Sequence, residues 1–155
     1  MPELELKVRK IRNGSVIDHI RAGYGLSVLK ILGITKNNTK PVAVAMHVNS
    51  PKINQPKDIV KVENRELKEH EVNKLALIAP KATINIIREY EVVEKMEVHL
   101  PDKIYDLIKC INPACITNTN EPTKPVFTII SKEPIKLKCN YCKKDIEEDA
   151  ILGQF

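Results

Sequence analysis

The chain of 155 residues contains no tryptophan, and aromatic residues make up only 4% of it. The hydrophobic core must therefore be built from aliphatic side chains, chiefly Ile, Leu and Val. A scarcity of aromatic rings also argues against a platform on which nucleic-acid bases stack. No apolar run approaches the roughly 20 residues that span a bilayer as a helix, so we expect no membrane segment.

The apolar stretch of a signal peptide is also missing from the first residues, where Met1-Pro-Glu-Leu-Glu-Leu-Lys7 alternates leucine with charge. We therefore expect a cytoplasmic protein whose thiols stay reduced. Under those conditions, clustered cysteines bind a metal more often than they form disulfides.

The net charge of +5 is unevenly distributed along the chain. Residues 1–100 carry 17 Lys and Arg against 12 Asp and Glu, a balance of +5, whereas residues 101–155 carry 8 of each kind. The basic excess therefore lies outside the segment that contains the four cysteines. Because binding to a phosphate backbone needs clustered Lys and Arg, that segment is a poor candidate for contact with nucleic acid.

Hydrophobic periodicity in the first hundred residues predicts short strands and two helices. Strands are expected over residues 4–12, 15–20, 42–48, 58–63 and 83–98, the last with a bulge or break near 88–91. Helices are expected over 22–32, which Gly33 can end in the left-handed conformation, and over 67–79, which Pro80 stops. Asn13-Gly14 is a hairpin turn signal that would join the first two strands.

After that extra hairpin, the order is strand, helix, two strands, helix, strand. This is the split βαβ or ferredoxin-like arrangement, so we predict an α+β protein whose N-terminal antiparallel sheet carries both helices on one face. The segment His99-Leu-Pro-Asp102 is the predicted junction to a small all-β domain resembling a zinc ribbon. In that domain only residues 126–130 and 135–138 have clear strand patterns.

The C-terminal segment of about 50 residues has too few apolar side chains to fold on a hydrophobic core alone. Its cysteines, Cys110, Cys115, Cys139 and Cys142, have the spacing C-x4-C-x23-C-x2-C. Two pairs of thiolates on tight turns supply the four soft ligands of tetrahedral zinc. Four protein ligands leave no position for water or substrate, so the expected zinc ion is structural. Unrelated thiols or two disulfides are the alternatives.

Several segments, in order, carry a resemblance to a known family: Gly14-Ser-Val-Ile-Asp-His-Ile20, Asp58-Ile-Val-Lys-Val-Glu-Asn64, Leu75-Ala-Leu-Ile-Ala-Pro-Lys-Ala-Thr83 with Asn85, Tyr90-Glu-Val-Val93 with Lys95, and the cysteine pattern. Through them nearly the whole chain resembles the regulatory chains of aspartate carbamoyltransferase. Only residues 1–9 depart from the family pattern, with Arg9 where an acidic residue is usual.

The resemblance implies a non-catalytic allosteric subunit of pyrimidine biosynthesis with two domains. Residues 1–99 would bind CTP or ATP in one pocket and form a homodimer with a second regulatory chain. Residues 100–155 would hold the zinc ion and dock on the catalytic chain, so that regulatory dimers bridge catalytic trimers. Which nucleotide inhibits and which activates is left open by the sequence.

The resemblance also implies which residues contact the nucleotide. His19 and Lys95 would bind phosphates, Lys61 a base carbonyl and the ribose, and Asp18 a ribose hydroxyl. The other members of the implied site are Asn85 as a neutral donor, Lys57 as a peripheral cation, and Ile11, Ile87, Tyr90 and Val92 around the base. Fixed cations suit the several negative charges of a nucleoside triphosphate.

Each of these residues also has an ordinary structural interpretation. A single lysine is usually a solvated charge, Asp18-His19 could be a hydrogen-bonded strand end, and a tyrosine such as Tyr90 is often a core residue with a wet hydroxyl. The remaining histidines have no matching role in the family, and we expect them to be structural or exposed: His47, His70 and His99.

Two other classes of function fit parts of the sequence. A nucleic-acid-binding zinc-ribbon protein would fit the sequence pI of about 9.0, but the charge-neutral cysteine segment argues against it. A small enzyme on a ferredoxin-like sheet would need a phosphate-binding Gly-rich loop, a nucleophile elbow or paired carboxylates, and the sequence shows none of these patterns.

Overall fold

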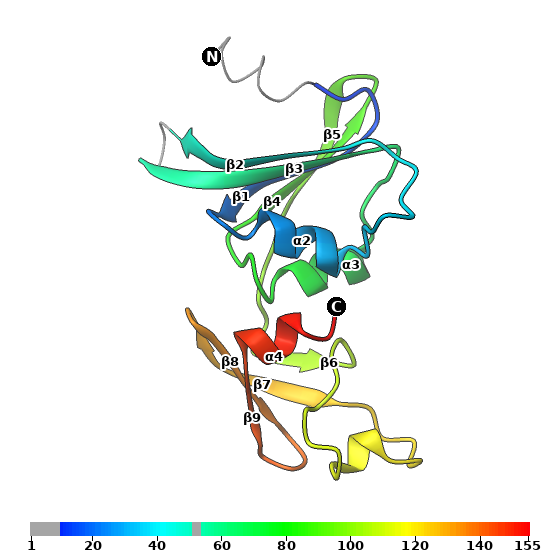
Figure 1. Ribbon diagram of the computed structural model, residues 1–155, viewed down its shortest axis with the longest axis vertical. Coiled ribbons are helices and arrows are strands. Elements are labelled where there is room, and N and C mark those ends of the chain that lie inside the picture. The colour runs from blue at the N-terminus through cyan, green and yellow to red at the C-terminus, as the bar shows by residue number, and fades with distance from the viewer. Residues whose placement is uncertain (1–9, 51–53) are drawn as a thin grey trace. The chain divides into compact units, whose positions relative to one another are not determined.

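A computed structural model describes residues 10–50 and 54–155 of the chain. The chain divides into two compact units, Met1–His99 and Leu100–Phe155. Figure 1 shows one sheet in each unit, with two helices beside the first sheet and one short helix beside the second. No helix in the described part of the chain is long and apolar enough to cross a membrane.

The first unit is built on a five-stranded antiparallel sheet with the strand order β2-β3-β1-β4-β5. Its strands are β1 (Gly14–Arg21), β2 (Val42–Ser50), β3 (Gln55–Glu63), β4 (Thr83–Arg88) and β5 (Glu91–Glu97). The first four strands and the two helices follow the predicted split βαβ order. The expected break near residue 88 is the turn between β4 and β5.

Both helices of the first unit lie on one face of this sheet, as predicted (Figure 1). They are α2 (Gly25–Ile31) and α3 (Glu69–Leu75), each shorter than the sequence pattern suggested. The N–H groups of Gly23 and Gly25 donate to a side chain of β3, so α2 starts late. Gly33 has a φ of +71° and ends the α2 region in the left-handed conformation, as expected.

Alternation along the strands places an aliphatic core between the sheet and the helices. The buried residues on the helix-facing side of the sheet include Ile17, Ile20, Val60, Val62, Ile84 and Ile86. Val28 and Leu75 of the two helices are fully buried as well. The side chains next to these along each strand therefore point away from the helices, onto the opposite face of the sheet, which we call the open face.

The predicted N-terminal hairpin is wrong. Gly14 pairs with Glu63 of β3 on one side and with Ile87 of β4 on the other, so β1 has no edge left for a strand that precedes Asn13. The local turn signal was overridden by pairing with two distant strands. Residues 4–9 of the predicted first strand, with Leu4, Leu6 and Val8, lie outside the described residues.

The second unit contains a four-stranded antiparallel sheet with the order β6-β7-β8-β9. Its elements are β6 (Lys103–Tyr105), the 3-10 turn η1 (Ile116–Asn118), β7 (Val126–Lys132), β8 (Ile135–Cys139), β9 (Asp145–Glu147) and α4 (Glu148–Leu152). The two predicted strands are β7 and β8. The small core consists mainly of Ile104, Phe127, Leu137, Ile146 and Ile151, so the predicted fold class is confirmed with one short helix added.

Candidate functional site

A line of polar residues crosses the open face of the first sheet. Lys61 of β3 is directly opposite Val16 of β1, Val16 is opposite Asn85 of β4, and Asn85 is opposite Lys95 of β5. Side chains directly opposite each other in antiparallel strands project from the same face. Lys61, Asn85 and Lys95 therefore share one face, with Lys61 and Lys95 three strand spacings, or about 14 Å, apart.

A bulge in β1 contains two further predicted site residues, Asp18 and His19. The pairing with β3 shifts between Ile17 and Ile20, and His19 within this bulge has a φ of +58°. The N–H of His19 donates to Asp18 Oδ1 at 2.7 Å, and His19 Nδ1 lies 3.1 Å from Thr83 Oγ1. Bulges commonly redirect side chains near binding sites. The left-handed backbone at His19 and the contact with Thr83 together position the histidine ring.

Lys57 is held by the same carboxylate. Its Nζ lies 2.9 Å from Asp18 Oδ1 and 3.2 Å from Oδ2, with little of either side chain exposed. Burial lowers the pKa of Lys61, an effect that Asp18 partly opposes and Lys10 reinforces. Asp18 thus lies among cationic groups, and Lys61 is partly desolvated. An anionic ligand nearby would favour the charged form of Lys61.

The predicted apolar residues gather near the start of β1. Ile87 is opposite Gly14 on one side and Val92 on the other. A Cβ on Gly14 would lie 3.1 Å from Ile11 Cδ1 and 2.1 Å from the Val62 oxygen, so only glycine fits there. Ile11 and Ile87 are buried, whereas Val92 is exposed. The apolar residues therefore lie in or beside the sheet where β1 begins, whereas Lys57 pairs with the other end of β1.

Tyr90 lies in the turn between β4 and β5. Its N–H donates to the Arg12 carbonyl at 2.9 Å, which ties this turn to the segment that precedes β1. The residue is 61% exposed, so the interpretation of Tyr90 as a core residue is wrong. An exposed tyrosine in this turn is available to a ligand.

Two residues near the site were not singled out from the sequence. Thr83 contacts His19 only because β4 pairs with β1, which no local pattern indicates. Asp58 is fully buried, and its carboxylate accepts the N–H groups of Gly23, Gly25 and His47 at 2.9, 2.8 and 2.9 Å. It fixes the turn before α2 and a bulge in β2, both beside Lys57.

The four cysteines of the second unit form one cluster. Their sulfur atoms all lie within 4.8 Å of one another, and all four are thiols rather than disulfides. The Sγ atoms of Cys110 and Cys142 are 3.5 Å apart, and those of Cys115 and Cys139 are 3.7 Å apart. Sulfurs bound tetrahedrally at about 2.3 Å from one metal would be separated by about 3.8 Å. The cluster therefore fits one metal ion.

Two tight turns present these sulfurs. In the first, the N–H of Cys115 donates to the Asn112 carbonyl, and Asn118 Nδ2 donates to the Cys110 carbonyl at 2.8 Å. In the second, the N–H of Lys143 donates to the Cys139 carbonyl at 3.0 Å. Backbone geometry thus fixes the ligand positions in advance.

The surroundings of the sulfurs promote thiolate formation at two positions. The backbone N–H of Lys144, above all, lowers the pKa of Cys142 to about 6. Burial acts to raise the pKa of Cys115, but hydrogen bonds from Thr117 outweigh it, and the net shift is downward. Burial raises the pKa of Cys110 to about 12. Ligation of all four sulfurs therefore requires a cation that displaces a proton from Cys110.

The other three histidines, His47, His70 and His99, are exposed. This confirms the expectation that they are structural or exposed.

Comparison with known proteins identifies both units. The family model described as "Aspartate carbamoyltransferase regulatory chain, allosteric domain" matches residues 6–99, and the model of its metal binding domain matches residues 102–152.

Curated relatives match along almost the whole chain. The aspartate carbamoyltransferase regulatory chain of Methanothrix thermoacetophila is 58% identical over 148 residues, which cover 96% of either chain. Those of Thermococcus sibiricus and Methanothermobacter thermautotrophicus are 55% and 52% identical, and each match covers at least 96% of both chains. Together with the two family models, these matches show that this chain belongs to the family of aspartate carbamoyltransferase regulatory chains.

Proposed function

We propose that this chain is a non-catalytic subunit that binds CTP and ATP at the open face of its first unit. In this proposal, one zinc ion holds the second unit, which docks on the catalytic chain of aspartate carbamoyltransferase. Two copies pair through their first units, and these dimers bridge catalytic trimers.

The observation that carries the nucleotide proposal is the line of Lys61, Asn85 and Lys95 across the open face. The triphosphate would lie among Lys95, His19 and Lys57, where several cations can share its charge. Lys61 would reach the ribose and a base carbonyl, and Asp18 a ribose hydroxyl. The base would lie at the apolar end of the site, beside Ile87, Tyr90 and Val92, with Asn85 as a neutral donor.

Zinc is the metal that best suits the four-cysteine cluster. Four thiolates favour a soft or borderline metal in a tetrahedron, and they leave no open coordination position for chemistry. The metal would therefore stabilise the second unit rather than catalyse a reaction. Such a role agrees with the small hydrophobic core of that unit.

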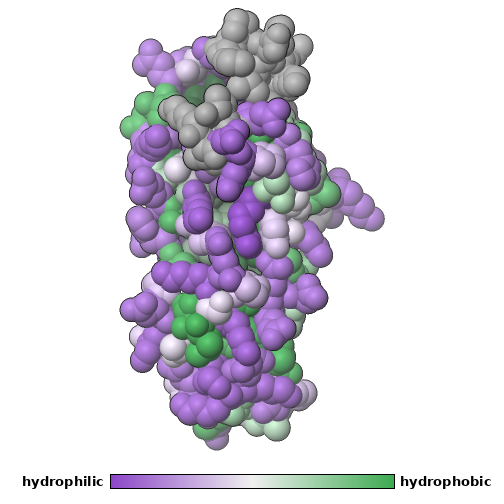
Figure 2. All heavy atoms as spheres, turned by 90° about the vertical axis from the view of Figure 1, so that its left-hand side faces the viewer, coloured by the Kyte–Doolittle hydropathy of each residue, from purple (hydrophilic) through white to green (hydrophobic). Residues whose placement is uncertain are grey.

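Docking on the catalytic chain is supported by apolar side chains on the surface of the second unit. Tyr105, Ile111, Ile116, Ile130 and Tyr141 are all exposed there. Figure 2 shows hydrophobic side chains gathered in the lower part of one face, which belongs to this unit, among hydrophilic neighbours. Exposed apolar groups rimmed by charge are typical of protein–protein contact sites.

Homodimer formation is supported by the two outer strands of the first sheet. Among the described residues, β2 and β5 each pair with a single strand. Such edges present unpaired backbone groups that a second copy can use. Regulation further requires that the nucleotide bind one quaternary state of the assembly more tightly than the other.

The nucleotide proposal can be tested by titration calorimetry of the zinc-loaded chain with CTP and ATP. Lys95→Ala should weaken binding of both nucleotides by at least about tenfold, because a charge-assisted contact is lost. Lys132→Ala, which removes an exposed lysine of the second unit, is the matched control and should bind as the unchanged protein does. Equal affinity of Lys95→Ala and the control would remove Lys95 from the site.

A further inference from the structure

A polar cavity lies away from the open face, at the ends of the two helices. It has a volume of about 700 Å³ and is bounded by the residues that follow α2, the end of β3 and the start of α3. This volume is in the range of small-molecule sites. Lys57, Lys61, Asn85 and Lys95 do not line it, so it is distinct from the nucleotide site proposed above. We call it the helix-end groove.

Positive charge predominates in the lining of this groove. It contains Lys40, Arg65, Lys68 and Lys74 but only two carboxylates, Glu66 and Glu71. His70 also lines it and adds charge when protonated. The lining therefore carries a net charge of at least +2.

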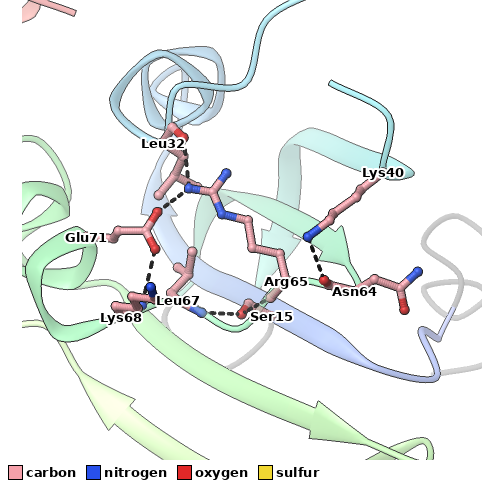
Figure 3. A network of polar contacts seen from close by, with 8 residues as sticks. All are labelled: Ser15, Leu32, Lys40, Asn64, Arg65, Leu67, Lys68 and Glu71. Atoms are coloured by element: carbon pink, nitrogen blue, oxygen red, sulfur yellow. Dashed lines mark hydrogen bonds and ion pairs between the residues drawn. The ribbon is translucent and has the colours of Figure 1, made fainter. Parts of the chain in front are cut away.

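Both carboxylates of the groove already have cationic partners. Glu66 accepts two bonds from Arg88, at 2.7 and 2.9 Å, and Arg88 does not line the groove. The second carboxylate, Glu71, pairs with Arg65 and accepts the N–H of Lys68 (Figure 3). Arginine side chains therefore pair with both acidic groups of the groove.

Two lysines keep charge that no carboxylate neutralises. Lys40 Nζ donates to the neutral carbonyl of Asn64 at 2.9 Å (Figure 3), and among the described residues no carboxylate contacts Lys40 or Lys68 through an ion pair. Both side chains belong to exposed residues. An anion in the groove would gain two charge-assisted contacts without breaking an existing ion pair.

Hydrogen bonds from β1 and to the end of α2 fix the wall of the groove. Ser15 of β1 is fully buried, donates to the Arg65 carbonyl at 2.7 Å and accepts the N–H of Leu67 at 3.0 Å (Figure 3). Arg65 in turn donates to the Leu32 carbonyl at the end of α2, at 2.9 Å. That bond covers partial negative charge at the helix end, which would otherwise oppose an anion.

We propose that the helix-end groove is a second anion site, which takes a small polyphosphate group and is independent of the open face. Lys40 and Lys68 supply the principal contacts, and the Ser15–Arg65–Glu71 network holds the wall in place. The polyphosphate could be free or part of a nucleotide, because both present the same phosphate oxygens. The proposal rests on the structure of the groove, but its test uses the variant of the nucleotide site to separate the two sites.

The test is calorimetric titration of the full zinc-loaded chain with inorganic tripolyphosphate, and separately with CTP, in the Lys95→Ala background. At least one of the two probes should still bind. Adding Lys40→Ala and Lys68→Ala should weaken that binding at least about tenfold. Adding Lys103→Ala and Lys132→Ala, two exposed lysines of the second unit, changes the charge equally and should leave binding intact.

Several outcomes would overturn the proposal. One is that neither probe binds in the Lys95→Ala background although the chain is folded by circular dichroism. Another is that the two groove substitutions weaken binding no more than the two control substitutions. If Lys95→Ala leaves CTP affinity unchanged while the groove substitutions abolish tripolyphosphate binding, the groove stands and the open-face proposal fails.

Discussion

The two units of this chain differ in what can stabilise their folds. The first unit buries a layer of isoleucine, leucine and valine between a five-stranded sheet and two helices. The second has four short strands around a small core, and its long loops converge on four cysteines. A segment of this size rarely folds on such a core without a bound metal or a disulfide. From this comparison we expect the first unit to fold without a metal and the second to depend on one.

The largest effect that separates the units should come from metal removal. Because metal binding to four thiolates contributes on the order of 10 kcal/mol to folding, chelation or Cys139→Ala should unfold the second unit and leave the first folded. Hydrogen exchange resolved by segment would show lost protection in β6 to β9 and retained protection in β1 to β5. Restoring zinc to the chelated protein is the control. Equal loss of protection in both units would contradict the contrast.

A smaller effect, confined to the first unit, is expected from Asp58→Ala. This substitution leaves three backbone N–H groups without their acceptor, at a cost of about 3 kcal/mol to the first unit. It should also weaken CTP binding, because the turn and the bulge beside Lys57 lose their common anchor. Urea unfolding, metal content and calorimetry would be measured together, with Asp102→Ala, an exposed carboxylate, as the control. Loss of bound metal in Asp58→Ala would show that destabilising the first unit also destabilises the second, and would contradict the contrast.

The smallest effect should arise at Lys61, whose pKa is lowered by burial. The folded state therefore releases the Lys61 proton at lower pH than the unfolded state does. Lys61→Met removes a partly desolvated charge, so the free chain should melt about 2 °C higher at neutral pH, while CTP binds more weakly.

This gain in stability has a defined pH dependence. In the unchanged chain, stability attributable to Lys61 rises as pH increases through its lowered folded pKa towards the ordinary value of 10.5, because the unfolded state then binds more protons. The advantage of Lys61→Met should shrink over that window. Melting curves from neutral to alkaline pH would test this, and an advantage that grows with pH would show that burial does not lower the pKa of Lys61.

Much of the architecture could be predicted from residue patterns because it depends on local periodicity. The alternation in β2, β3 and β4 and the spacing of the four cysteines are properties of short segments. β6 and β9 have only three residues each, too few for a periodic signal. The hairpin at Asn13-Gly14 was predicted wrongly because local patterns do not reveal the pairing partners of β1, which lie far away in the sequence.

The sites were predictable to a lesser extent. Family likeness indicated Lys61, Asn85 and Lys95, but their common row depends on strand register across four strands. Asp58 follows Lys57 in β3 and, as a charged residue, resembles a solvent-facing carboxylate until its three backbone donors are known. The helix-end groove combines three separate segments, so no single stretch of sequence indicated it.

The central claim, that nucleotide binding to this chain regulates a partner enzyme, is tested most directly by reconstitution. The zinc-loaded chain would be combined with the catalytic chain of aspartate carbamoyltransferase, and the rate would be measured against aspartate with and without CTP or ATP. The account predicts that at least one nucleotide shifts the aspartate response of the assembly but not that of the catalytic chain alone. Superimposable curves for an assembly that demonstrably contains both chains would contradict it.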